Sequence, residues 1–145
     1  LHYFCLTAGA NSLGILLGVY MANYTDATPA EIGLLYMIMP FIGLIFRPIL
    51  CSMADRRQAH REYLIVCELM TALSFAPFVI IPYLGEEFHE SHPRFCWYSL
   101  VSFRIVGDIA FKGAISIGDS LAINYAARLG TEFSTYRIWG TIAWM

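Results

Sequence analysis

The feature that most constrains the fold of this chain is a series of long apolar stretches separated by short polar segments. A helix needs about 20 mostly apolar residues to cross the hydrocarbon core of a bilayer. Only 14% of the 145 residues are charged, whereas soluble domains carry about a quarter. We therefore predict an all-α integral membrane protein. The membrane-spanning helices are expected at residues 2–23, 30–53, 63–84 and 95–126, with the start of a fifth at about Ile138.

The start of the second predicted helix is marked by the sequence Thr28-Pro29-Ala30-Glu31. Thr28 is a suitable N-cap, and Pro29 suits the first helical position because its missing N–H has no partner there in any case. Glu31 stands three residues after the cap, where its side chain can return a hydrogen bond to the backbone of Thr28. We therefore expect a capping box that begins this helix.

The basic residues are unequally divided among the connecting segments. The segment after the second stretch contains Arg56, Arg57 and Arg61, and the one after the fourth contains Arg128 and Arg137. Cytoplasmic loops of membrane proteins carry an excess of Lys and Arg. We therefore predict that these two segments and the amino terminus are cytoplasmic. Among cellular membranes, the plasma membrane is the favoured location.

The fourth stretch contains Arg104, Asp108, Lys112 and Asp119 within an otherwise apolar sequence. At 100° per residue, the four side chains fall within an arc of about 80° and so share one helix face. Asp108 is four residues from both Arg104 and Lys112, the spacing at which opposite charges pair along a helix. The charges of this stripe sum to zero. Asp119 approaches the cytoplasmic end, whereas the other three lie deeper.

Charged side chains at membrane depth are costly, and they commonly mark the pathway of an ion, a proton or a substrate. We interpret Arg104, Asp108 and Lys112 as lining such a pathway. The alternative is a neutralised salt bridge that only holds helices together. Asp119 is interpreted as an interface or gating residue because of its position near the cytoplasmic end.

Three further polar residues lie inside predicted spans. Arg47 lies in the second and Glu68 in the third, at matching distances from the cytoplasmic side. Adjacent antiparallel helices would bring them together, so a structural ion pair and a proton-accepting role for Glu68 both remain open. Asn11, about halfway along the first span, can hydrogen-bond either a polar solute or a neighbouring helix.

Several classes of function lack support in the sequence. A net charge of −2 leaves no broad basic surface for nucleic acid. The four cysteines form no C-x-x-C pair of the kind found in zinc sites. The acidic segment that contains His89 and His92 is better interpreted as a solvated outer loop than as a metal site. Motifs for nucleotide binding or hydrolysis do not occur. We therefore expect no enzyme, no metal and no cofactor.

Two sequence patterns resemble those of a known family. Residues 51–57, Cys-Ser-Met-Ala-Asp-Arg-Arg, keep the Asp-Arg core of the pattern G-x-x-x-D-R-x-G-R-[RK], which follows the second helix of major facilitator superfamily transporters. Arg104 and Gly107 loosely match a second pattern of that superfamily, an Arg followed shortly by Gly in helix four. The chain resembles the amino-terminal part of such a transporter. The positions that depart from the first pattern are Cys51, Gln58 and Ala59.

Two longer stretches resemble a particular branch of this superfamily. Residues 118–144 and 20–36 are similar to the animal proteins described as "major facilitator superfamily domain-containing", which group with lactose-permease-like and nucleoside-proton-symporter-like members. The resemblance implies a twelve-helix protein of two six-helix halves, with a central cavity that opens alternately to each side. The chain begins at Leu1 and stops at Met145 within a new apolar segment. We therefore expect a fragment of the amino-terminal half.

The resemblance also implies roles for individual residues. Asp55 and Arg56 correspond to residues that make gating contacts on the cytoplasmic face, and Arg61 lies in the same loop. Arg104, Asp108 and Lys112 are the candidates for the cavity and for proton coupling. The expected partners are the lipid bilayer, a small polar solute, protons and the remaining helices of the full-length chain.

The resulting hypothesis is a secondary active or facilitative transporter of a small polar solute, with coupling to protons as an open question. A second hypothesis is a multi-pass membrane receptor or scaffold that keeps the transporter fold without transport, because a fold does not determine a function. A third is a complete four-span protein of the tetraspanin type. The short outer loops, without a Cys-rich one, argue against this third hypothesis.

Overall fold

The chain is described by a computed structural model that covers residues 2–84 and 91–143, except for the side chains of residues 2, 3, 6, 10–15, 84 and 93. Within these residues every regular element is a helix, which confirms the predicted all-α fold class. The elements are α1 (His2–Tyr24), α2 (Pro29–Arg57), α3 (His60–Ser74), α4 (Ala76–Ile80), the 3₁₀ helix η1 (Ile81–Leu84), α6 (Pro93–Leu129) and α7 (Phe133–Ile142).

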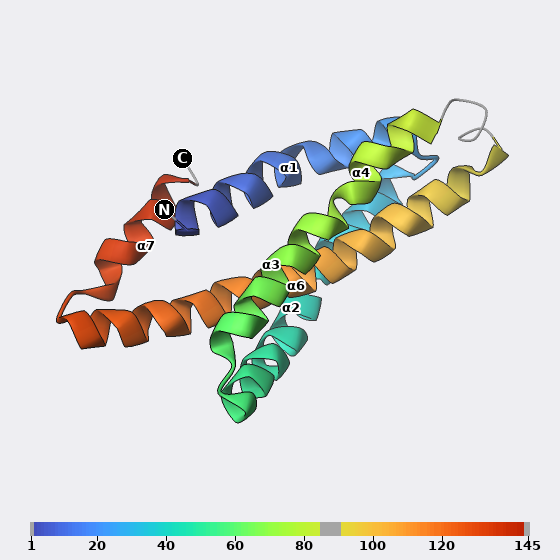
Figure 1. Ribbon diagram of the computed structural model, residues 1–145. Coiled ribbons are helices and arrows are strands. Elements are labelled where there is room, and N and C mark those ends of the chain that lie inside the picture. Colours follow the sequence, from blue (N-terminus) through green and yellow to red (C-terminus); the bar gives the residue numbers. More distant parts are fainter. Residues whose placement is uncertain (1, 85–90, 144–145) are drawn as a thin grey trace.

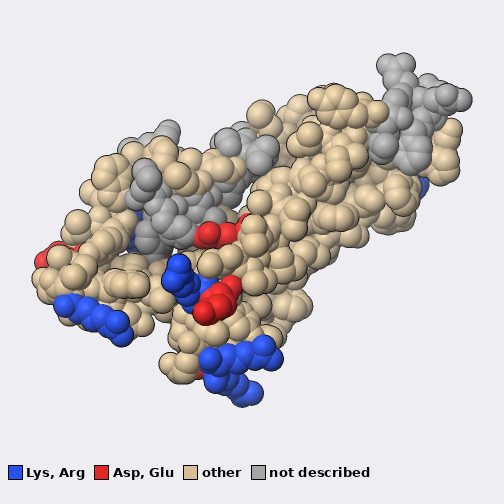
Figure 2. Space-filling model, in the orientation of Figure 1, with Lys and Arg blue, Asp and Glu red and all other residues tan. Residues whose placement is uncertain are grey.

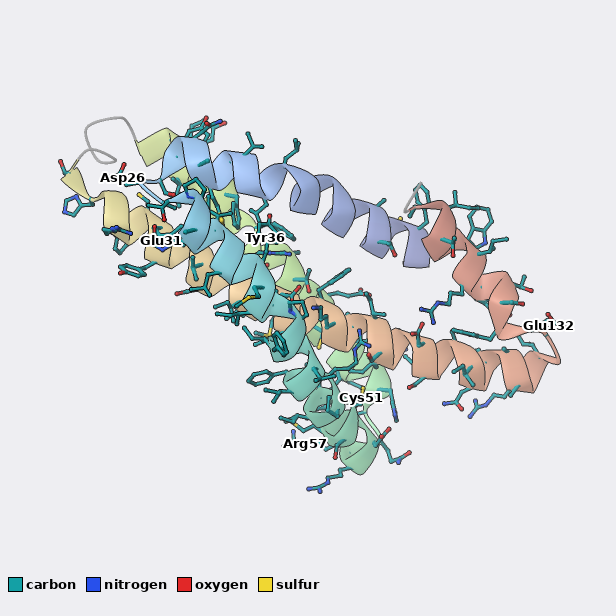
Figure 3. All side chains as sticks on the ribbon, turned by 180° about the vertical axis from the view of Figure 1, so that it is seen from behind. Asp26, Glu31, Tyr36, Cys51, Arg57 and Glu132 are labelled. Atoms are coloured by element: carbon teal, nitrogen blue, oxygen red, sulfur yellow. The ribbon has the colours of Figure 1, made fainter. Side chains whose placement is uncertain are left out.

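The long helix α6 is the element on which α2 and α3 pack (Figure 1). At one end of the molecule, the α1–α2 turn, η1 and the start of α6 gather together. At the other end, the α2–α3 hairpin and the α6–α7 pair diverge as two arms, and α7 returns beside the amino end of α1. Figure 3 shows the same arrangement from behind, with Glu31 at the gathered end and Arg57 and Glu132 at the tips of the arms.

Two buried clusters hold the helices together. The larger one lies at the gathered end and joins α1, α2, η1 and α6 through residues such as Met21, Met39 and Leu100. The smaller one joins α2, α3 and α6 through Ala54, Cys67, Ala114 and Ile117. Away from these clusters many large apolar side chains are exposed. A soluble monomer rarely exposes such extended apolar surface, whereas lipid covers it in a membrane.

The predicted capping box at the start of α2 is confirmed. The Thr28 hydroxyl oxygen accepts a hydrogen bond from the Glu31 backbone N–H at 3.3 Å, and the Thr28 N–H donates to Glu31 Oε2 at 2.8 Å. The other carboxylate oxygen of Glu31 accepts a hydrogen bond from Arg94 Nη1 at 2.8 Å. This contact ties the start of α2 to the start of α6.

The helix α2 extends to Arg57, four residues beyond the predicted span. It ends at Gln58, which has a left-handed conformation with φ of 52° and whose N–H caps the carbonyls of Ala54 and Asp55. The polar residues that close the helix stand outside the apolar stretch. Hydropathy therefore located the apolar part of the helix and not its end.

The third predicted span, residues 63–84, is interrupted in the structure. α3 starts three residues earlier, at His60, and ends at Ser74, and the chain continues as the short helix α4 and the 3₁₀ helix η1. Pro77 has no N–H to donate, and its ring crowds the preceding turn. The Phe75 N–H bonds to the carbonyl of Ala72, only three residues back. The proline therefore accounts for the break that hydropathy missed.

The helices α6 and α7 are also longer than predicted. α6 covers residues 93–129 instead of 95–126, and it ends at Gly130, whose φ of 65° suits a residue without a side chain. α7 starts at Phe133, five residues before the predicted Ile138. The first turn of α7 contains Ser134 and Thr135, polar residues that hydropathy excluded from the span although they are helical.

Two segments of the described chain are long and apolar enough to cross a membrane, Pro29–Arg57 and His60–Tyr83. On the face drawn in Figure 2, charged side chains gather over the diverging arms, and the described charges at the gathered end include the Glu31–Arg94 pair. The two basic turns, which contain Arg57 and Arg128, both belong to these arms. This distribution fits a helical membrane protein.

Candidate functional site

The helix α6 places Arg104, Asp108 and Lys112 one turn apart in a single row. Lys112 Nζ lies 3.1 Å from Asp108 Oδ2, and Arg104 Nη2 lies 3.9 Å from Asp108 Oδ1. Both ion pairs are those that the spacing of the sequence predicts. Asp108 is only 6% exposed, so the row has a buried carboxylate at its centre and a cation on each side. We call these three residues the charged triad.

The position of Lys112 depends on a glycine of the neighbouring helix. A Cβ atom at Gly43 of α2 would lie less than 3.0 Å from Cδ and Nζ of Lys112. With glycine at this position, Lys112 lies across α2, and its Nζ is 3.5 Å from the backbone carbonyl oxygen of Met39. α2 therefore supplies both the space and a weak acceptor for the ammonium group.

The polar atoms of the charged triad are incompletely satisfied. Within the described residues, Nε of Arg104 and Oδ2 of Asp108 are buried without a hydrogen bond. The short distance between Lys112 and Asp108 is thus an ion-pair contact that lacks the alignment of a hydrogen bond. The 3.9 Å contact of Arg104 exceeds hydrogen-bond length. A buried polar group without a partner costs free energy, so this arrangement needs an explanation beyond simple structural pairing.

The helix α3 packs along the same length of α6. The Ser74 hydroxyl faces Gly107 and donates a hydrogen bond to the carbonyl of Thr71 at 2.6 Å. Glu68, also on α3, is half-buried, and its Oε1 is enclosed. Arg47 is exposed on α2, and no ion pair within 4.0 Å joins it to Glu68 among the residues with described side chains. The predicted structural pair between these two residues therefore stays a prediction.

Asp119 has a partner that the sequence reasoning missed. Arg137 of α7 places Nη1 3.4 Å from Asp119 Oδ2, and its guanidinium also lies 5.9 Å from the centre of the Phe133 ring. The pair joins the last third of α6 to the start of the next helix. From the sequence, Arg137 was interpreted only as a loop charge. Asp119 and Arg137 are 18 residues apart across a turn, and helical periodicity does not predict a contact at that separation.

At the tip of the α2–α3 hairpin, Asp55 Oδ1 lies 2.7 Å from Nε2 of His60, so the Asp of the family pattern contacts the start of α3. Arg56 and Arg61 are exposed beside this pair. Between the hairpin and the carboxyl end of α6 lies an open hollow of about 220 Å³. Its lining residues are Gln58, His60, Leu121, Asn124, Tyr125 and Arg128.

Two sequence predictions cannot be placed. The side chain of Asn11 and the residue His89 lie outside the described part of the chain. Within the described residues, no group of three or more His, Cys, Asp or Glu side chains could hold a metal ion.

Comparison with known proteins identifies a family for this chain. The family model described as "MFS_1 like family" matches residues 1–145. No curated protein and no solved structure matches the chain. The match covers the charged triad and the Asp55–His60 contact as well as the apolar helices. The chain therefore belongs to the MFS_1 like family, which is related to the major facilitator superfamily and indicates a membrane protein with a transporter-related fold.

Proposed function

We propose that the chain is the amino-terminal part of a twelve-helix secondary transporter that moves a small polar solute by alternating access. Active transport and facilitative transport are both compatible with such a site. The observation that carries it is the charged triad, a row of three charges with a buried carboxylate at its centre, on the helix against which α2 and α3 pack. We place the triad on the solute pathway.

The interactions of the charged triad do not fit a purely structural role. A structural ion pair needs one cation for one carboxylate and is stabilising only when its hydrogen bonds are complete. Here two cations share Asp108, and buried atoms of Arg104 and Asp108 have no hydrogen bond within the described chain. Charged residues inside membrane spans typically face a cavity or pathway. A solute or water in that pathway would complete the missing contacts.

Coupling to protons is a further part of the proposal. Carboxylates within membrane spans take part in the proton relays of many pumps and transporters. Glu68 is a carboxylate on α3 with an enclosed oxygen, and we propose it as the proton-accepting group of a symporter. Asn11 of α1 is proposed as an additional hydrogen-bonding residue for the solute.

Gating is proposed at the diverging arms. The Asp55–His60 contact at the hairpin tip and the Asp119–Arg137 pair between α6 and α7 are exposed or half-exposed polar contacts that can break without leaving buried charges. Arg56 belongs to the same basic turn. Rocking of one half of a transporter against the other makes and breaks contacts at such ends. We place these arms in the cytoplasm of an animal cell, with the plasma membrane as the favoured location.

The proposal is tested by uptake of a panel of radiolabelled small polar solutes into proteoliposomes that contain the full-length protein, with and without a pH gradient. We expect Asp108→Asn and Lys112→Ala to abolish uptake. Arg94→Gln is the matched control, because it also removes an Arg ion pair, but at the outer end of α6. Glu68→Gln should remove only the dependence on the pH gradient. Uptake that survives both triad substitutions would contradict the assignment of the pathway.

A further inference from the structure

The four charged residues of the α6 stripe do not all neutralise one another in the structure. The four charged residues of the stripe sum to zero, but Asp119 pairs with Arg137 of α7. Asp119 also lies seven residues beyond Lys112, about 10 Å along the helix. The charged triad therefore keeps two cations and one carboxylate, which leaves one positive charge.

The neighbouring helices do not remove this charge. The described part of α1 carries no Lys, Arg, Asp or Glu, α2 contributes Arg47, and α3 contributes Glu68. Arg47 is exposed and Glu68 is half-buried, and among the described residues the ion pairs of Arg104 and Lys112 are those with Asp108. Glu31, at the outer end of α2, is already bound to Arg94. One positive charge therefore remains within the apolar part of the bundle.

The geometry assigns this charge to Arg104. Lys112 Nζ has two close oxygens, Asp108 Oδ2 at 3.1 Å and the Met39 carbonyl oxygen at 3.5 Å. Arg104 has only the 3.9 Å contact, which is too long for a hydrogen bond, and its buried Nε has no hydrogen-bond partner within the described chain. The carboxylate of Asp108 thus mainly neutralises Lys112. The positive charge of the guanidinium group of Arg104 is therefore not neutralised, and its Nε–H has no acceptor within the described chain.

We propose that Arg104 binds the oxyanion of an anionic solute, a carboxylate or a phosphate group. This inference rests on the proposed transport function and names the class of its solute. The planar fork of a guanidinium group donates two parallel hydrogen bonds to a carboxylate or a phosphate, and an ammonium group does not reproduce this geometry. An oxyanion would satisfy Nε and complete the charge balance of the bundle at once. Asp108 and Lys112 then act as positioning residues, because their pairing keeps the carboxylate away from the guanidinium.

The test measures binding and uptake with matched solute pairs that differ by the anionic group. The pairs are glucose 6-phosphate with glucose, and lactate with lactamide, applied to the purified full-length protein. We expect at least one anionic member, and no neutral one, to raise the unfolding temperature of the wild-type protein. The phosphate and carboxylate pairs distinguish the two sources of the oxyanion. A wild-type protein that neither binds nor transports any anionic member would overturn the inference.

Substitutions of Arg104 complete the test. Arg104→Gln should weaken binding of the anionic member by about 10- to 100-fold, the loss expected for a hydrogen bond to a charged group. Arg104→Lys keeps the buried charge and should bind more weakly than wild type but more tightly than Arg104→Gln. This second variant carries the test if Arg104→Gln fails to fold, as judged by gel filtration and by the unfolding temperature without solute. Equal affinity of the wild type and both variants would overturn the assignment.

The outcomes separate this inference from the function on which it rests. Uptake of neutral solutes that requires Asp108 but not Arg104 would overturn the anionic solute and leave transport standing. Binding of an anionic member that requires Arg104, without any uptake, would support the inference and contradict the proposed transport.

Discussion

A close contact between α3 and α6 gives a prediction that is independent of function. A Cβ atom at Gly107 would lie less than 3.0 Å from both Oγ and Cβ of Ser74. Ser74 is 4% exposed, and its hydroxyl is held by a hydrogen bond to the carbonyl of Thr71 at 2.6 Å. Neither group is the end of a flexible side chain, so the substitution Gly107→Ala must push the two helices apart.

The expected size of the effect follows from two opposing contributions. Overpacking a close contact costs about 1–3 kcal/mol of the free energy of unfolding. Replacing a glycine inside a helix by alanine returns about 1 kcal/mol through higher helix propensity. The cost of overpacking should exceed the gain in helix propensity, because helices in membranes associate mainly through close packing. We expect Gly107→Ala to destabilise the protein by about 0–2 kcal/mol, the difference between these two contributions.

Three comparisons isolate the contact in unfolding measurements on the full-length protein in detergent micelles. Gly33→Ala is the control, because nothing lies within 4 Å of a Cβ there, and it should be neutral or slightly stabilising. Ser74→Gly removes both clashing atoms and should restore the Gly107→Ala protein, whereas Ser74→Ala removes only Oγ and should restore it in part. A double-mutant cycle then gives the coupling, about 0.5–3 kcal/mol for residues in contact. A coupling near zero, or a Gly107→Ala protein as stable as Gly33→Ala, would refute this account of the interface.

Two further predictions concern α2. Gly43→Ala should abolish uptake, because the new methyl group meets the side chain of Lys112 and displaces it from Asp108. Uptake equal to that of Gly33→Ala would show that Lys112 needs no such space. Thr28→Ala should lower the free energy of unfolding by about 0.5–2 kcal/mol through loss of the N-cap. Thr25→Ala serves as the comparison, because it removes a hydroxyl that is hydrogen-bonded within the preceding turn. If the Thr28→Ala protein had the same unfolding midpoint as wild type, the capping box would not contribute to stability.

The features that the sequence predicted well depend on neighbours along the chain. The capping box of Thr28 and Glu31 and the ion pairs of Asp108 each need residues only three or four positions apart. Helical geometry fixes such contacts whatever the rest of the protein does. The family patterns around Asp55 and Gly107 were also visible, although a physical reason for either residue was not apparent from neighbouring positions.

The features that were missed depend on which helices are neighbours. The break after Ser74 was readable from Pro77, but hydropathy averages over a window and does not register the loss of one hydrogen bond. The contact between Asp119 and Arg137 and the one between Gly43 and Lys112 both cross between helices. Periodicity shows which face of a helix is polar and does not show what stands opposite it.

The concentration of charge on α6 has a packing explanation. Gly107 and Gly113 allow α3 and α2 to approach α6 so closely that one face of α6 is enclosed where the charged triad lies. α2, by contrast, exposes large apolar side chains such as Leu44 over much of its surface. A charge on such a surface would face lipid at a cost of several kcal/mol, on the order of 2.5–3.5 kcal/mol at the centre of a helix. The glycines that bring the helices together therefore also make α6 the helix best able to carry Asp108, so substitutions at the glycines and in the charged triad should affect one another.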